Sequence, residues 1–252
     1  MVSCRCDSPR PCAIFLLGIV IVTAWFGVVD ASRARGSVMG SGMEDISHKC
    51  SRIECPEYRV VHKGAGFEVR LYSPTAWMIK GSITSMSFTS ATMTGFHALF
   101  QYIEGANVNN SRVEMTAPVR TSIIPSDGPF CSSAFSVGFL VPKSFNGNPP
   151  LPLPELSLKL VKWETPRCTL VRQFGGYAKD DNIAKEALNL ANDLASTKWE
   201  PVLDIIRKKG EPSYSIAQYD DPLRVWGRLN EVWVEFESAD DECSPKVDTG
   251  NA

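Results

Sequence analysis

Short runs that alternate apolar and polar residues fill the middle of the chain, separated by glycine, proline and serine. This period of two is typical of half-buried strands, and two longer stretches show the helical period instead. The predicted strands cover 58–63, 67–72, 76–83, 111–123, 133–142, 156–164, 167–178, 214–219 and 230–236. The order of strands, helix and strand occurs twice, which is a weak internal duplication. The pattern predicts an α+β fold in which a curved sheet or barrel packs against two helices.

One helix is predicted in each half of the chain, over about 87–104 and about 180–198. Apolar residues of the first helix recur at helical spacing, at Phe88, Ala91, Gly95, Phe96, Leu99 and Ile103. The candidate N-caps are Ser87 or Thr89 for the first helix and Asp180 or Asp181 for the second. Each is a residue type that accepts hydrogen bonds from the free N–H groups of a first helical turn.

Pro118 interrupts the run SRVEMTAPVRTSI, from Ser111 to Ile123, which otherwise alternates like a strand. Proline has no N–H group to donate to a sheet ladder, so it is excluded from central strands. We therefore expect Pro118 at an edge, a bend or a bulge of the sheet.

The N-terminal stretch is typical of a secretory signal peptide. Arg5 and Arg10 precede an apolar run over 13–29, and small residues follow that run. A single membrane anchor is the alternative, although the apolar run is slightly short to span a bilayer. We expect a signal peptide over 1–31, cleaved after Ala31, and a secreted or lumenal mature protein without membrane contact.

The segments on either side of the predicted strands contain few apolar residues. Residues 32–52 are small and polar, and they are predicted to form a flexible linker. Almost no apolar residue follows Glu237, so 238–252 is predicted to be a disordered tail. These bounds leave a single folded domain over 53–237.

The net charge and the cysteine spacing argue against nucleic-acid binding and against a metal site. The 252-residue chain has a formal net charge of −2, which argues against binding nucleic acid through its phosphates. The cysteines outside the leader are Cys50, Cys55, Cys131, Cys168 and Cys243. One or two structural disulfides are expected in an oxidising compartment, with Cys50 and Cys55 paired with each other or with Cys131 and Cys168. No paired Cys/His spacing predicts a metal site.

One N-glycosylation sequon, Asn109-Asn110-Ser111, lies between the first predicted helix and the strand that follows it. Such a position is compatible with a surface loop of a secreted protein, although three-residue matches also occur by chance.

Eight short segments occur together and in a fixed order: PEYRVV, FEVRLYSP, GFHALFQYIEGAN, VEMTAPV, FLVP, VRQFGGYA, AQYDDP and GRLNEVW. As a set they resemble the SOUL haem-binding family very closely, over about 53–237. The resemblance implies a distorted β-barrel of two similar strand–helix–strand halves with two flanking helices. It also implies that haem or another tetrapyrrole binds in an apolar groove beside the first helix, for carriage or buffering rather than catalysis.

The resemblance also assigns residues to this groove. The groove residues are Met93, Phe96, Phe100, Gln101, Met115 and Arg224. Arg224 matches a basic position near the haem propionates, and its guanidinium can pair with a carboxylate through two hydrogen bonds. His97 stands next to Phe96 and is a candidate iron ligand, since a neutral imidazole can bind haem iron. The alternative for the aromatic and methionine residues is core packing, and for His97 a surface or packed position.

The chain departs from the family's pattern at three positions. Some members carry basic side chains on the groove helix where this chain has Met93 and Gln101. One member has a histidine, proposed as an iron ligand, within the segment FEVRLYSP, where this chain has Leu71. We therefore expect weaker or differently selective porphyrin binding, and no inherited metal ligand.

No motif in the sequence predicts an enzyme, because GxSxG, HExxH, P-loop and Cys/His signatures are all absent. Glu114 and Glu231 lie in predicted strands, where structural hydrogen bonding or solvent exposure is expected rather than catalysis. The alternative function is a secreted interaction module that uses the same groove for a peptide or another amphipathic ligand. The sequence does not identify a protein partner.

Overall fold

The computed structural model describes residues 45–124, 133–209, 213–238 and 240–245. The strands are β1 (Tyr58–Lys63), β2 (Glu68–Tyr72), β3 (Thr75–Ser85), β4 (Val119–Ile124), β5 (Ser133–Leu140), β6 (Leu158–Trp163), β7 (Arg167–Gly175), β8 (Tyr214–Gln218) and β9 (Leu229–Phe236). The α-helices are α1 (Ile46–Cys50), α2 (Phe88–Ile103), α3 (Ile183–Leu194) and α4 (Glu200–Lys209). Two short 3₁₀ helices lie at Lys143–Phe145 and Pro154–Leu156.

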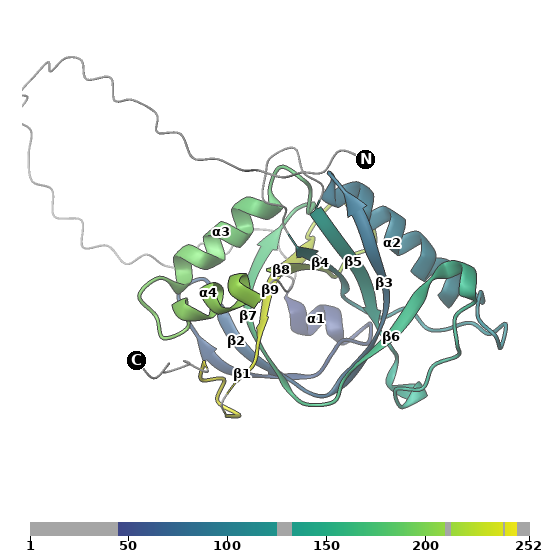
Figure 1. Ribbon diagram of the computed structural model, residues 1–252, viewed down its shortest axis with the longest axis horizontal. Coiled ribbons are helices and arrows are strands. Elements are labelled where there is room, and N and C mark those ends of the chain that lie inside the picture. The colour runs from purple at the N-terminus through teal and green to yellow at the C-terminus, as the bar shows by residue number, and fades with distance from the viewer. Residues whose placement is uncertain (1–44, 125–132, 210–212, 239, 246–252) are drawn as a thin grey trace, which may run out of the picture. The chain divides into compact units, whose positions relative to one another are not determined.

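The nine strands of this described part form one antiparallel sheet in the order β1–β2–β7–β9–β8–β4–β5–β3–β6. The sheet curls into a half-barrel with β1 and β6 at the two ends of the order (Figure 1). The predicted α+β class is confirmed. Eight of the predicted strands lie within about three residues of the observed ones, and the exception is the run 111–123.

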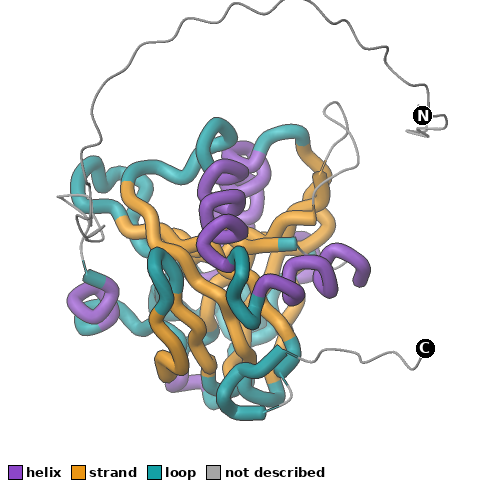
Figure 2. The backbone as a smooth tube through the Cα atoms, turned by 90° about the vertical axis from the view of Figure 1, so that its left-hand side faces the viewer, coloured by secondary structure: helices purple, strands orange, loops and turns teal. Residues whose placement is uncertain are grey.

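Helices pack on both faces of the curled sheet. α2 packs against β3 and β5, α3 packs against β7 and β9, and α4 packs against β9, while α1 lies at one end of the curl (Figures 1 and 2). Alternation along a strand sends successive side chains to opposite faces. Val232 therefore packs with the α3 side chains, whereas the next residue, Trp233, packs in the cluster that includes Ile46 of α1.

α2 begins where it was predicted to begin, and its close approach to the sheet depends on one glycine. Ser87 is the N-cap, and its side chain accepts a hydrogen bond from Ser90 N. A Cβ atom added to Gly95 would lie 2.4 Å from the side chain of Val137 on β5. Only glycine at this position lets the helix backbone lie so close to the strand.

Asp180, expected to cap the second helix, caps α2 instead. It lies in the β7–α3 connection and accepts hydrogen bonds from Ser87 Oγ, Phe88 N and Thr89 N. The N-cap of α3 is Asn182, whose side chain makes no capping hydrogen bond to that helix. The local prediction was wrong because the unpaired N–H groups of α2 are brought to Asp180 by the tertiary fold.

Pro118 lies immediately before β4 rather than within it. The Ala117–Pro118 peptide bond is cis, and the ladder of β4 starts at Val119. The predicted strand over 111–123 is therefore too long at its N-terminal side. Pro118 nevertheless takes no part in the hydrogen-bond ladder, which was the basis of the prediction.

The second predicted helix, over 180–198, is divided in two. α3 ends at Leu194, because Ala195 is extended and Ser196 has a left-handed φ of 62°. α4 follows and was not predicted. Pro201 stands in the first turn of α4, where a missing N–H group costs no helical hydrogen bond.

Both segments predicted to be unstructured contain ordered residues. Within the predicted linker 32–52, α1 forms, and its Lys49 is buried and pairs with Asp220. Within the predicted tail 238–252, Cys243 is fully buried. The tail prediction is wrong for 240–245, because a disulfide holds this segment against β7.

Two disulfides form among the described cysteines. Cys50 pairs with Cys55, one of the two alternatives predicted for them, and Cys168 pairs with Cys243, which was not predicted. Cys131, the predicted leader and residues 246–252 lie outside the described residues.

Candidate functional site

The outer face of α2 carries apolar side chains where a surface helix usually carries polar ones. Met93 is 52% exposed and Phe100 is 45% exposed, although each is a large apolar side chain. His97 and Gln101 are exposed on the same face, and Phe96 is half-buried. The residues that bury the opposite face are Phe88, Ala91, Gly95, Leu99, Tyr102 and Ile103. Core packing therefore does not account for Met93 or Phe100.

Two aromatic rings on this face lie together. The centroids of Phe96 and Phe100 are 5.9 Å apart, and the ring planes are inclined by only 28°. Spacing of four residues brings the two side chains to the same side of the helix. They form a stacked pair with one ring half-buried and the other exposed.

The β8–β9 loop, residues 219–228, presents a second group of exposed apolar side chains. Leu223 is 86%, Val225 is 61% and Trp226 is 84% exposed. Arg224 is the one residue of this loop that was predicted to contact the ligand. Three apolar residues within one short polar loop were the signal that could have identified the others, because such residues are seldom exposed together without a function.

The buried side chain of Arg228 holds this loop through hydrogen bonds to its backbone. Arg228 is 3% exposed, and its Nη1 donates hydrogen bonds to the carbonyl oxygens of Asp221 and Arg224, both at 2.8 Å. Its guanidinium lies over the ring of Tyr177, 4.3 Å from the centroid. The loop is therefore tied to its own base and to the β7–α3 connection.

Arg224, the predicted propionate partner, is half-buried in this loop. Its Nε lies 2.8 Å from the Trp226 carbonyl oxygen and 3.2 Å from Asp220 Oδ1. Asp220 also accepts a hydrogen bond from Leu229 N at 2.7 Å and pairs with Lys49 of α1. The Asp220 carboxylate thus holds the guanidinium of Arg224 at the root of the loop.

The β4 strand lies between α2 and the β8–β9 loop. The hydroxyls of Thr92 on α2 and Thr121 on β4 are hydrogen-bonded at 3.0 Å. Val119, at the start of β4, pairs with Gln218, the last residue of β8, directly before the loop. Met115 is 40% exposed in the segment that leads into β4. The predicted site residues therefore lie on α2, in the segment that leads into β4 and in the β8–β9 loop, and among them Phe96 and Phe100 are in ring contact.

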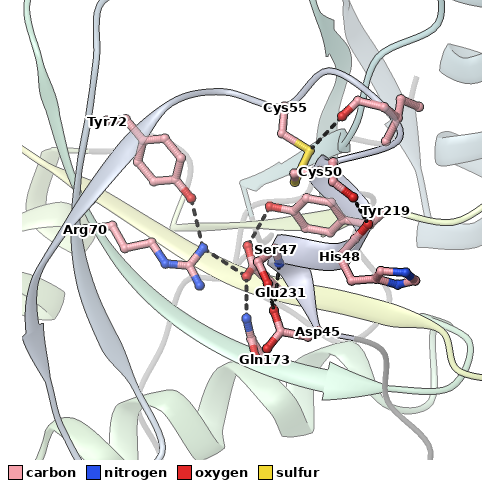
Figure 3. Close-up of a disulfide and its surroundings, with 12 residues drawn as sticks. Asp45, Ser47, His48, Cys50, Cys55, Arg70, Tyr72, Gln173, Tyr219 and Glu231 are labelled. Carbon is pink, nitrogen blue, oxygen red and sulfur yellow. Dashed lines mark hydrogen bonds and ion pairs between the residues drawn. A yellow bond between two sulfur atoms is a disulfide. The ribbon is translucent and has the colours of Figure 1, made fainter.

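Inside the curl, Glu231 is fully buried and has four partners, of which Arg70, Tyr219 and Gln173 are labelled in Figure 3. It accepts hydrogen bonds from Tyr219 Oη at 2.8 Å, Trp233 Nε1 at 2.7 Å and Gln173 Nε2 at 3.1 Å. Its fourth partner is the guanidinium of Arg70, with Nη1 2.9 Å from Oε1. Glu231 therefore has the structural role that was predicted for it.

The charges of this cluster reinforce one another. Burial alone would lower the pKa of Arg70, but Glu231, together with Tyr72, Tyr219 and Tyr58, outweighs burial and raises that pKa. Burial also raises the pKa of Tyr72 and of Tyr219 well above the ordinary value of 10. Both phenols therefore stay protonated, and Arg70 stays charged, at any physiological pH.

Three clefts open elsewhere on the described surface, with volumes of about 730, 470 and 560 Å³. The first lies beside the Cys50–Cys55 disulfide, and the second adjoins it through Pro56 and Lys143. The third is lined by His62 and Trp199, among others. None of the three is lined by a residue of α2 or of the β8–β9 loop.

The described residues contain no candidate metal site and no candidate membrane-spanning helix. No group of three or more His, Cys, Asp or Glu side chains there could hold a metal ion. No helix in the same part of the chain is long and apolar enough to cross a membrane.

Comparison with known proteins identifies the family. A family model described as SOUL heme-binding protein matches residues 53–235. Heme-binding protein 2 of Homo sapiens is 31% identical over 172 residues, which cover 67% of this chain and 77% of that protein. Heme-binding protein 2 of Mus musculus is 28% identical over 200 residues (78% and 90%), and Heme-binding protein 1 of Mus musculus is 30% identical over 152 residues (60% and 75%). With most of its described residues inside the family match, the chain belongs to the SOUL heme-binding protein family.

Proposed function

We propose that this protein binds haem or a related tetrapyrrole on the surface formed by the outer face of α2 and the β8–β9 loop. The observation that carries the proposal is the exposure of large apolar side chains on both α2 and the β8–β9 loop. Met93 and Phe100 stand on the helix, and Leu223, Val225 and Trp226 stand on the loop. The ligand is carried or buffered there, and no catalytic step is involved.

The chemistry of a porphyrin matches these side chains. A macrocycle is a flat apolar plate. The stacked rings of Phe96 and Phe100 are inclined to each other by only 28°, so both can face such a plate. Burying apolar surface contributes about 25 cal/mol per Å², so a few hundred Å² supply several kcal/mol. After ordering costs, an affinity of about −8 kcal/mol, or micromolar, is expected.

Two polar side chains on this surface are suited to contact the propionates and the iron of haem. Arg224 is held at the root of the loop by Asp220, where its guanidinium can pair with a propionate. His97 is exposed on α2 next to Phe96, and it is the imidazole of this surface that could reach iron. Leu71, which replaces a histidine of one family member, lies on β2 opposite Arg59 and Cys168, away from α2. Binding therefore depends on apolar contact more than on coordination of iron.

Export of the protein forms part of the proposal. The leader predicted over 1–31 directs the chain into the secretory pathway, and two disulfides are compatible with an oxidising compartment. A peptide or another amphipathic molecule on the same surface is the second candidate, because the exposed side chains of Leu223 and Trp226 can also pack against the apolar side of such a molecule.

The test is titration of the purified mature protein with haem and, separately, with protoporphyrin IX. We expect a Soret shift and saturable quenching of tryptophan fluorescence with both ligands, because the contact is apolar. Phe100→Asp should weaken both affinities at least tenfold, or about 1.4 kcal/mol. Leu188→Asp is the matched control, since Leu188 is a 59% exposed apolar residue on α3.

Two outcomes would contradict the proposal. One is the absence of saturation with either ligand. The other is an equal loss of affinity in the Phe100 and Leu188 variants, which would place the ligand elsewhere. Saturation by an amphipathic peptide without any response to porphyrin would favour the second candidate.

A further inference from the structure

The connection between α2 and β4 presents an asparagine side chain to solvent inside the sequon Asn109-Asn110-Ser111. This segment lies outside the proposed porphyrin surface and has no part in its chemistry. Asn109 is exposed, and its side chain makes none of the hydrogen bonds that hold the surrounding loop. A modification of this side chain therefore requires no rearrangement of the fold.

The loop owes its shape to Asn107, which is 3% exposed. The Nδ2 of Asn107 donates to the carbonyl oxygens of Tyr102 at 3.1 Å and Ser111 at 2.7 Å. Its Oδ1 accepts from the backbone N–H groups of Asn109 and Ser111, both at 3.2 Å. Because one buried side chain holds both ends of the sequon, the side chain of Asn109 is displayed on an ordered turn.

Two exposed apolar residues lie next to the sequon. Val108 is 58% exposed and Leu151 is 68% exposed, and Val108 N donates a hydrogen bond to the Leu151 carbonyl oxygen at 2.9 Å. These side chains belong to no core cluster of the described residues. An attached glycan is bulky and hydrophilic, so a glycan on the adjacent Asn109 would shield this pair from solvent.

We propose that Asn109 is an N-glycosylation site and that its glycan covers the apolar pair of Val108 and Leu151. The co-reactant is an oligosaccharide carried on a polyprenyl pyrophosphate. The Nδ2 atom of Asn109 forms a bond to C1 of the first sugar as the bond from C1 to the phosphate oxygen breaks. The lipid pyrophosphate leaves, and the amide loses one proton. The site rests on the export proposed above and is independent of porphyrin binding.

The experiment uses the full chain, with its own leader, produced in eukaryotic cells and collected from the medium. Intact mass is measured before and after treatment with peptide N-glycosidase. We expect a mass excess that the enzyme removes, with Asn109 converted to aspartate in the corresponding peptide. Asn109→Gln should abolish the excess. Asn148→Gln, an exposed asparagine outside any sequon, should leave the excess unchanged.

Retention on a hydrophobic-interaction column tests the shielding. The deglycosylated protein should be retained longer than the glycosylated one, and Val108→Ser should remove most of that difference. A secreted chain whose Asn109 peptide is unmodified would overturn the proposal, and so would a chain that stays in the cytosol. Neither result would alter the porphyrin titration, so failure of this proposal is distinguishable from failure of porphyrin binding.

Discussion

Single residues inside the curl show how the sheet tolerates a full charge away from solvent. Glu231 and Arg70 are both fully buried, and each would be costly without the other. The sheet surrounds Glu231 with the donors of Tyr219, Trp233 and Gln173, so no oxygen of the carboxylate lacks a partner. A glutamate in a strand with alternating pattern could be predicted to be structural, but its partners come from strands that the sequence could not place.

Replacing Glu231 by glutamine should destabilise the protein by about 3–5 kcal/mol, because the charge of Arg70 would stay buried without its counter-ion. Glu68→Gln is the matched control. Glu68 pairs with the same arginine at 2.8 Å but is 26% exposed, so its loss should cost about 1 kcal/mol or less. Urea denaturation at pH 7 measures both differences in unfolding free energy. Similar losses of unfolding free energy in the two variants would show that burial does not determine how much an ion pair with Arg70 stabilises the protein.

Elements that depend on local pattern were predicted well, and elements that depend on tertiary contacts were not. The period of two located β1, and the spacing of apolar residues located α2, because both signals lie within one segment. The division of the second helix into α3 and α4 depends on a left-handed Ser196, which no period reveals. The assignment of Asp180 to α2 depends on a loop residue 92 positions beyond Phe88, the first residue of that helix.

Asp180→Asn should destabilise the protein by about 1 kcal/mol at pH 7, since a carboxylate at a helix N-terminus loses its charge. Partial burial opposes the charge, but hydrogen bonds from Thr89, Ser87 and Phe88 lower the pKa of Asp180 below its ordinary value of 3.8. A lowered pKa means that the stabilisation is complete above about pH 4 and is lost as pH falls through the folded-state value. The difference between variant and wild type should therefore shrink at low pH.

Thermal unfolding between pH 2 and pH 7 measures this dependence. Asp181→Asn is the control, because Asp181 is an equally exposed carboxylate in the next position. A difference that stays constant with pH, or one that the Asp181 variant reproduces, would contradict the capping role of Asp180.

At the scale of the whole molecule, the family and its α+β class could be predicted from eight ordered segments, while the strand order could not. β2 pairs with β7, and Leu71 lies opposite Cys168, across almost a hundred residues of chain. The groove beside α2 stays a prediction. Met93 and Phe100, which the resemblance assigned to it, are exposed, whereas the exposure of Leu223, Val225 and Trp226 was not predicted, because exposure is a property of the assembled surface. The ordering of the tail was missed for the same reason.

The two disulfides should therefore contribute unequally to stability. Cys168–Cys243 closes a separation of 75 residues, and Cys50–Cys55 closes one of 5. Loop-closure entropy predicts about 4 kcal/mol for the long loop and about 2 kcal/mol for the short one. The Cys168–Cys243 disulfide also holds the C-terminal segment against the fold, where Trp199 Nε1 donates to the Cys243 carbonyl oxygen at 2.9 Å. Urea denaturation of the paired Cys→Ala variants tests this order, and a larger loss for Cys50 and Cys55 would mean that the N-terminal segment, rather than the tail, closes the fold.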